Sequence, residues 1–155
     1  SLVIVLSQLL IFNHINLFGT VDTYIYVSLF ILYKTTYDKT YLILFGFIVG
    51  LIIDLSLQTY GAHTLASITV CYLKERIEKY SFGVNSTLPL AMIRGTQQTN
   101  RVTYFFLIIF LHSLIYFSLI FFKFEFALTI FLFTLINSII NFIIIWIISM
   151  LIFDK

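Results

Sequence analysis

The stretch Gly46-Phe-Ile-Val-Gly50-Leu-Ile-Ile-Asp54 is followed, after a short gap, by Gly61-Ala-His63. Gly46, Gly50 and Asp54 recur at four-residue steps, so they share one face of a predicted helix. Small residues let a second helix approach closely, and an ionisable group in a membrane helix usually faces protein or a water-filled cavity. We therefore expect a helix-contact face, formed either by close packing within the chain or by a partner's helix.

The composition indicates a membrane protein. The chain has 155 residues, a mean hydropathy of +1.05 and only 10% charged residues, whereas soluble domains carry about 25%. This length fits one domain, residues 1–155. The formal charge of +2 is too small to suggest nucleic acid as a partner. The single cysteine, Cys71, excludes an internal disulfide.

The hydrophobic runs predict an all-α integral membrane protein, a six-helix transmembrane bundle. The predicted spans are approximately 2–17, 21–33, 41–57, 61–80, 102–122 and 126–153. A span needs about 20 residues. The second and fourth runs are short, so we expect these segments to be thin, tilted or partly re-entrant, which requires a backbone buried in protein.

The basic residues predict the orientation. If both termini are cytoplasmic, only Lys123 of the nine Lys and Arg residues falls outside, as the positive-inside rule favours. The longest cytoplasmic loop, predicted at 74–101, carries five basic residues. It serves either as a topology determinant beside anionic lipid or as a docking segment for a cytoplasmic partner. These residues are Lys74, Arg76, Lys79, Arg94 and Arg101.

The polar residues form two predicted layers. Asp54 and His63 lie near the outer boundary on either side of a tight turn. We expect them to pair as a structural clasp, or alternatively to bind a ligand, partner or proton. Asn13, His14, Asn16 and Asp22 fall at the same level.

The second layer lies near mid-membrane. His112 is on the fifth predicted span, and Asn137 and Asn141 are on the sixth. We expect hydrogen bonds between helices here, each contributing about 0.6–2 kcal/mol. For His112, a proton-relay or ligand role is the alternative.

Enzyme and metal motifs are missing from the sequence. It has no H-E-x-x-H, G-x-S-x-G or P-loop pattern, and its three histidines lack metal-ligand spacing. We therefore expect no catalytic activity, no cofactor and no metal site.

Four motifs in order resemble a known family. They are Asn13-His-Ile-Asn-Leu-Phe-Gly19, the stretch from Gly46 to Leu55, Gly61-Ala-His63-Thr-Leu-Ala-Ser67 and Tyr72-Leu-Lys-Glu-Arg76. Their order and spacing are similar to those of the MreD family of bacterial rod shape-determining proteins, particularly its Bacteroidetes forms. The resemblance covers roughly residues 8–80. The later part matches in hydrophobic layout and in Leu111-His112, but the acidic residue that often follows this histidine is here no nearer than Glu125.

The resemblance implies a non-enzymatic scaffold subunit in the bacterial inner membrane, within the cell-elongation complex that directs peptidoglycan synthesis. Members of this family work with MreC, the actin-like MreB filament, RodA and a class B penicillin-binding transpeptidase. On this reading the face of Gly46, Gly50 and Asp54 would bind an MreC-like partner, and the basic loop would face the filament.

The implied fold resembles the six-helix substrate-binding subunits of energy-coupling-factor vitamin transporters. This likeness supplies the alternative function, a small-molecule binding subunit of a membrane transporter. Its cavity would open at the outer face near His14, Asp54 and His63.

Overall fold

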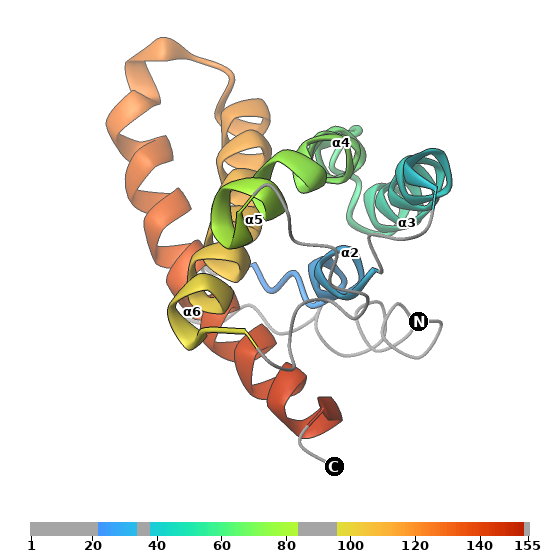
Figure 1. Cartoon of the computed structure of the whole chain (residues 1–155). Coiled ribbons are helices and arrows are strands. Elements are labelled where there is room, and N and C mark those ends of the chain that lie inside the picture. The colour runs from blue at the N-terminus through green and yellow to red at the C-terminus, as the bar shows by residue number, and fades with distance from the viewer. Residues whose placement is uncertain (1–21, 34–37, 84–95, 154–155) are drawn as a thin grey trace.

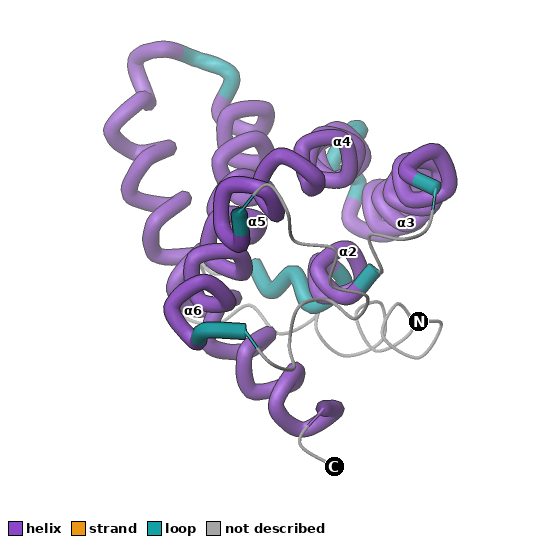
Figure 2. Tube along the Cα trace, viewed as in Figure 1, coloured by secondary structure: helices purple, strands orange, loops and turns teal. Residues whose placement is uncertain are grey.

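The computed structural model describes residues 22–33, 38–83 and 96–153. Of these residues 86% are helical and none is in a strand, which confirms the all-helical class (Figure 2). The elements are α2 (Val27–Leu32), α3 (Lys39–Leu57), α4 (Ala62–Phe82), α5 (Gln98–Phe121), a short 3-10 helix (Phe124–Phe126) and α6 (Ala127–Phe153).

Three of these helices are long and apolar enough to cross a membrane: α3, α5 and α6 over Ala127–Leu151. They correspond to the predicted spans 41–57, 102–122 and 126–153. The fourth predicted span becomes α4, whose second half is too charged to qualify. The first predicted span, 2–17, lies outside the described residues.

The second predicted span, 21–33, differs most from the structure. Only Val27–Leu32 is helical, and residues 22–26 form a non-helical lead-in to α2. The short length of this run predicted a thin, tilted or partly re-entrant segment, but not its partners, which are side chains of α6 described below.

The long helices pack in chain order. α4 lies between α3 and α5, and α6 packs on the other side of α5 (Figure 1). The turn joining α3 to α4 and the end of α5 line one pocket, so the two tight turns lie at the same end of the molecule. We call this the turn end, and the opposite end, where α4 finishes and α5 begins, the loop end.

The core lies where α2, α4 and α5 meet. Phe30, Phe105 and Ile108 are fully buried there. By contrast, α3 and α6 expose large apolar side chains along their outer faces, including Phe47, Leu51, Ile139 and Ile143. Such outer surfaces suit a lipid environment.

The predicted loop 74–101 is partly helical, and its first part belongs to the overlapping predicted span 61–80. α4 continues to Phe82 and α5 begins at Gln98, so four of the five basic residues of this loop lie on helices. Ion pairs one turn apart extend α4: Lys74 pairs with Glu78, and Glu75 with Lys79 at 2.7 Å. Gly83, at φ 91°, ends the helix, and its N–H donates to the carbonyl of Lys79.

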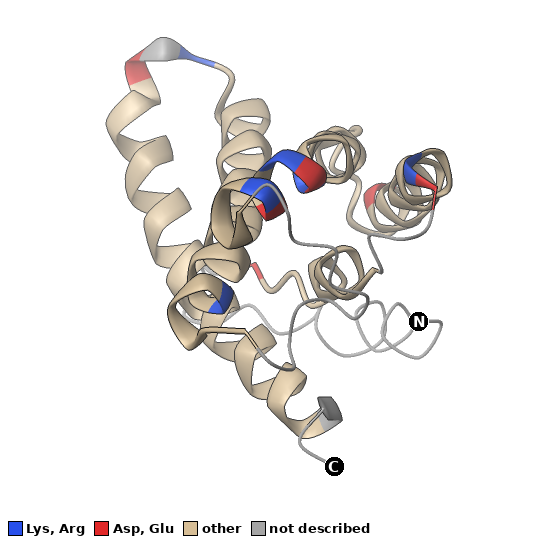
Figure 3. Cartoon of the chain, viewed as in Figure 1, with Lys and Arg blue, Asp and Glu red and all other residues tan. Residues whose placement is uncertain are grey.

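Charged positions are unevenly distributed. In Figure 3 they gather on the second half of α4 and at the starts of α3 and α5, while the α5–α6 turn carries one of each sign. Of the described basic residues, only Lys123 belongs to the turn end. Lys34, Arg94 and Lys155 lie outside the described residues.

Candidate functional site: a buried polar cluster

Asp54, near the end of α3, caps the start of α4. Its carboxylate accepts hydrogen bonds from the backbone N–H of His63 at 3.0 Å and of Thr64 at 2.8 Å. The hydroxyls of Thr59 and Thr64 also donate to it, the latter at 2.5 Å. His63 and Thr64 are the second and third residues of α4, whose N–H groups have no partner within the helix. The carboxylate also meets the positive end of the helix dipole.

Gly61 explains why the cap comes from another helix. It occupies the N-cap position of α4, where Ser, Thr, Asp or Asn usually supplies the capping oxygen, and it has no side chain. Its φ of 92° lies in the left-handed region that favours glycine. The tight turn therefore excludes a local capping side chain, and Asp54 takes its place.

Gly46 and Gly50 bring α3 against α4. A Cβ on Gly50 would lie 2.6 Å from the Cα of Thr64, and one on Gly46 would lie 2.6 Å from the Sγ of Cys71. The face of Gly46, Gly50 and Asp54 is thus covered by α4 from within the chain. A partner's helix would have to displace α4 to reach it.

The lead-in to α2, residues 22–26, passes through the protein interior towards α5 and α6 (Figure 1). Two asparagines of α6 bind its backbone. The side-chain oxygen of Asn137 accepts from the N–H of Asp22 at 2.9 Å, and that of Asn141 accepts from the N–H of Tyr24 at 2.6 Å. The amide of Asn141 also donates to the carbonyl of Asp22 at 2.9 Å. Non-helical backbone at membrane depth is tolerated only with such partners.

Two histidines meet at one tyrosine hydroxyl. The hydroxyl of Tyr26 lies 2.9 Å from Nδ1 of His63 and 2.7 Å from Nε2 of His112. All three side chains are at most 1% exposed.

Tyr24 and Tyr116 complete this cluster. The ring of Tyr116 stacks on that of His63 at 4.4 Å, and its hydroxyl donates to the Asp22 carboxylate at 3.3 Å. The ring of Tyr24 packs against both histidines. We call Tyr24, Tyr26, His63, His112 and Tyr116 the aromatic cluster.

Residues of the two predicted polar layers meet in the aromatic cluster, since His63 and His112 both contact Tyr26. Asp54 and His63 do come together, but through the backbone N–H of His63, whereas its ring turns to Tyr26. His112, Asn137 and Asn141 all make hydrogen bonds to the segment 22–26, where we expected contacts between long helices. Asn13, His14 and Asn16 lie outside the described residues.

The basic residues separate into buried and surface groups. Lys74 is buried with Glu78, which also accepts from the hydroxyl of Tyr104 at 3.2 Å. Arg76 and Lys79 are exposed. The Arg101 guanidinium lies over the ring of Trp146 at 5.2 Å.

The sequence interpretation missed Tyr24, Tyr26, Tyr116 and the pair of Glu78 with Tyr104. One signal was available: the run Asp22-Thr-Tyr-Ile-Tyr26 places several hydrogen-bonding side chains in a segment too short to cross a membrane as a helix. Buried polar groups of this kind need partners.

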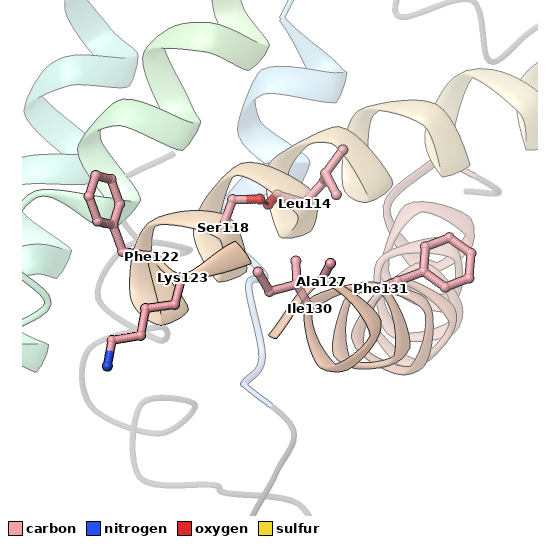
Figure 4. A pocket seen from close by; sticks show the side chains of 7 residues that line it. All are labelled: Leu114, Ser118, Phe122, Lys123, Ala127, Ile130 and Phe131. Atoms are coloured by element: carbon pink, nitrogen blue, oxygen red, sulfur yellow. Dashed lines mark hydrogen bonds between the residues drawn. The ribbon is translucent and has the colours of Figure 1, made fainter. Parts of the chain in front are cut away.

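Three pockets lie at the turn end. One, of about 490 Å³, is lined by Asp54, Thr64 and apolar neighbours. Another, of about 500 Å³, lies between α5 and α6 and is apolar apart from Ser118 and Lys123 (Figure 4). Within the described part of the chain, no three His, Cys, Asp or Glu side chains group as metal ligands.

Comparison with protein-family models, with curated proteins and with solved structures finds no match to this chain.

Proposed function

We propose that this chain is a non-enzymatic scaffold subunit of a bacterial cell-elongation complex, of the MreD type, that binds an MreC-like partner in the inner membrane. Through that partner it would act with an MreB-like filament, RodA and a class B penicillin-binding transpeptidase. Three apolar helices are compatible with a membrane protein. The loop end, with most of the basic residues, would face the cytoplasm.

One observation carries the proposal: residues of the second and third motifs of the resemblance act together in a single unit. Gly46 and Gly50 bring α3 against α4, Gly61 forms the turn, and Asp54 closes it on the backbone of His63. A motif set that depends on one hairpin geometry supports a common fold more strongly than separate matches do. It also gives these residues a structural role that does not depend on catalysis.

The partner surface follows from what α4 leaves uncovered. Because α4 occupies the Gly46 and Gly50 face, we assign the MreC-like contact to the outer face of α3. This face exposes Phe47, Leu51 and Leu55. Replacing Gly50 with Leu would therefore disrupt the α3–α4 hairpin itself and would not test the interface.

The experiment is affinity purification of the tagged chain from native membranes, followed by mass spectrometry. MreC-like and RodA-like proteins should be enriched over an unrelated tagged membrane protein. Leu51→Trp should reduce recovery of the MreC-like protein, whereas Ile139→Trp, the same kind of change at another exposed position, on α6, should not. Absence of both partners from the wild-type sample would contradict the proposal.

The alternative function is a small-molecule binding subunit of a transporter. The pocket beside Asp54 favours it, because a volume of about 490 Å³ lies within the usual range for ligand sites, roughly 300–1,000 Å³. Saturable binding of a vitamin-sized ligand by the purified protein, weakened by Thr64→Val, would support this function. Unchanged binding in that variant would exclude this pocket.

A further inference from the structure

We propose that His63, Tyr26 and His112 form a proton relay inside the protein. This inference is independent of the scaffold function. It starts from an unusual arrangement, in which one phenolic hydroxyl contacts two buried imidazole nitrogens at 2.9 and 2.7 Å. Histidines in membrane proteins often mark proton relays.

The single proton of the hydroxyl couples the two rings. A tyrosine hydroxyl donates one hydrogen bond, and a neutral imidazole has one N–H and one lone pair. If Tyr26 donates to Nδ1 of His63, then Nε2 of His112 must donate to Tyr26, and both rings carry their proton on Nε2. If Tyr26 donates to His112, both rings carry it on Nδ1. The geometry thus allows two states, and the rings share a tautomer in each.

The outer nitrogens of the two rings are the ends of the relay. Within the described structure, Nε2 of His63 and Nδ1 of His112 are buried and have no hydrogen-bond partner. In either state one of them presents an N–H and the other a lone pair. Buried polar atoms without partners call for an explanation such as water or a functional role.

In one transfer, each group of the triad gains one proton and loses one. The N–H proton at Nε2 of His112 moves to the Tyr26 oxygen, while the Tyr26 proton moves to Nδ1 of His63. His112 takes up a proton at Nδ1 from water, and His63 releases its Nε2 proton to water. The triad resets when each ring turns out of its contact with Tyr26, gives its Nδ1 proton to water, takes one from water at Nε2 and turns back, while the Tyr26 hydroxyl turns to His63 again.

Two rows of polar side chains extend away from the His63 end of the triad. On the His63 side, the stacked Tyr116 leads to the half-buried carboxylate of Asp22. Towards the loop end, one buried stripe of α4 continues from His63 at helical spacing. The stripe consists of Ser67, Cys71, Lys74 and Glu78. Consecutive members are three or four residues apart, about one helical turn, and Lys74 and Glu78 are in direct contact.

The test measures proton flux into vesicles that contain the purified full chain. A potassium gradient with valinomycin sets the potential, and an internal pH-sensitive dye reports protons, with no other ligand. Wild-type protein should give flux above protein-free vesicles, and Tyr26→Phe should lose it. Tyr24→Phe is the matched control: this ring is also buried in the cluster, but its hydroxyl has no partner among the described residues. It should keep the flux.

A second measurement does not depend on transport. Nitrogen-15 spectra of histidine-labelled protein, simplified by His14→Asn, should show His63 and His112 protonated on the same type of ring nitrogen. Tyr26→Phe should remove this agreement. Opposite tautomers in the wild type, flux no higher than in empty vesicles, or equal flux in the wild type and Tyr26→Phe would each overturn the proposal.

Discussion

The carboxylate of Asp54 is part of α3 but caps the start of α4. It is only 7% exposed and has four donors around its two oxygens, three of them on α4. Its position near the end of a long apolar helix could be predicted from the sequence. Its donors could not, because the backbone N–H groups of α4 are aimed at it only when the Gly61 turn has formed.

Replacing Asp54 by Ala should lower the free energy of unfolding by about 3 kcal/mol, because it leaves buried N–H groups of α4 without an acceptor. Asp54→Asn should cost less, since one oxygen still accepts. Thermal unfolding in detergent measures both. Asp38→Ala is the control, because Asp38 caps α3 at the surface through one bond to the N–H of Thr40 and should cost only about 1 kcal/mol. Equal losses at the two sites would contradict the role of Asp54 as a buried cap.

His63 illustrates the limit of reasoning from residue positions. Its proximity to Asp54 could be predicted from the short turn, but its ring direction could not. The ring contacts Tyr26, which belongs to the short second hydrophobic run. A hydrogen bond between residues 37 apart in sequence leaves no periodic signal.

At the scale of elements, helix lengths were the most predictable feature. The long apolar runs became α3, α5 and α6 with small shifts at their ends, because a long hydrophobic run satisfies its own backbone groups as a helix. The predicted span 21–33 became only the short helix α2 for the complementary reason. Its backbone partners are side chains on α6, more than a hundred residues away.

The two glycines of α3 should respond differently to alanine. In Gly50→Ala the added Cβ meets the backbone of Thr64, which cannot move without separating α3 from α4. In Gly46→Ala it meets the Sγ of Cys71. This sulfur atom is absent when Cys71 is replaced by alanine. Overpacking typically lowers the free energy of unfolding by about 1–3 kcal/mol. We expect Gly50→Ala to lower it by more than about 2 kcal/mol and Gly46→Ala to lower it by less.

Thermal unfolding of the two variants tests this order. The double change Gly46→Ala with Cys71→Ala should recover most of the stability lost in Gly46→Ala. No recovery would show that the contact with Cys71 is not the source of the loss.

Asn141→Leu should release the lead-in to α2, because it leaves the N–H of Tyr24 and the carbonyl of Asp22 without partners. We expect a loss of roughly 2–4 kcal/mol for two unsatisfied buried groups. Proteolysis and thermal unfolding of the purified protein report it. Asn100→Leu, in the half-exposed first turn of α5, serves as the control and should change little. A loss of similar size in the control would point to a general effect of the apolar substitution.

At the scale of the whole molecule, the distribution of charge predicts the orientation in the membrane. Basic residues gather at the loop end, and Lys123 stands at the turn end (Figure 3). The sequence pattern was sufficient for this prediction, because loop charge counts do not depend on how the helices pack. Which helix faces are covered depends on packing, so the Gly46 and Gly50 face could not be assigned to an inner or outer contact from sequence alone.

Cysteine labelling in intact cells tests the orientation. Cys71 is the sole cysteine and is buried, so Cys71→Ala provides a cysteine-free background. In that background Lys123→Cys should react with a membrane-impermeant maleimide from outside the cell. Lys79→Cys, exposed at the loop end, should react only after permeabilisation. The reverse pattern would place the turn end in the cytoplasm.

The capping of α4 by Asp54 has a consequence for biosynthesis. The carboxylate precedes its backbone donors by only nine and ten residues, so its partners emerge from the ribosome almost immediately after it. A chain ending after α3 would present the Asp54 carboxylate to the translocon without its donors on α4, whereas a chain ending after α4 presents it with those hydrogen bonds formed. The two helices should therefore enter the bilayer together. In an insertion assay, Asp54→Asn should increase membrane insertion of the chain that ends after α3. It should not change the insertion of the chain that ends after α4.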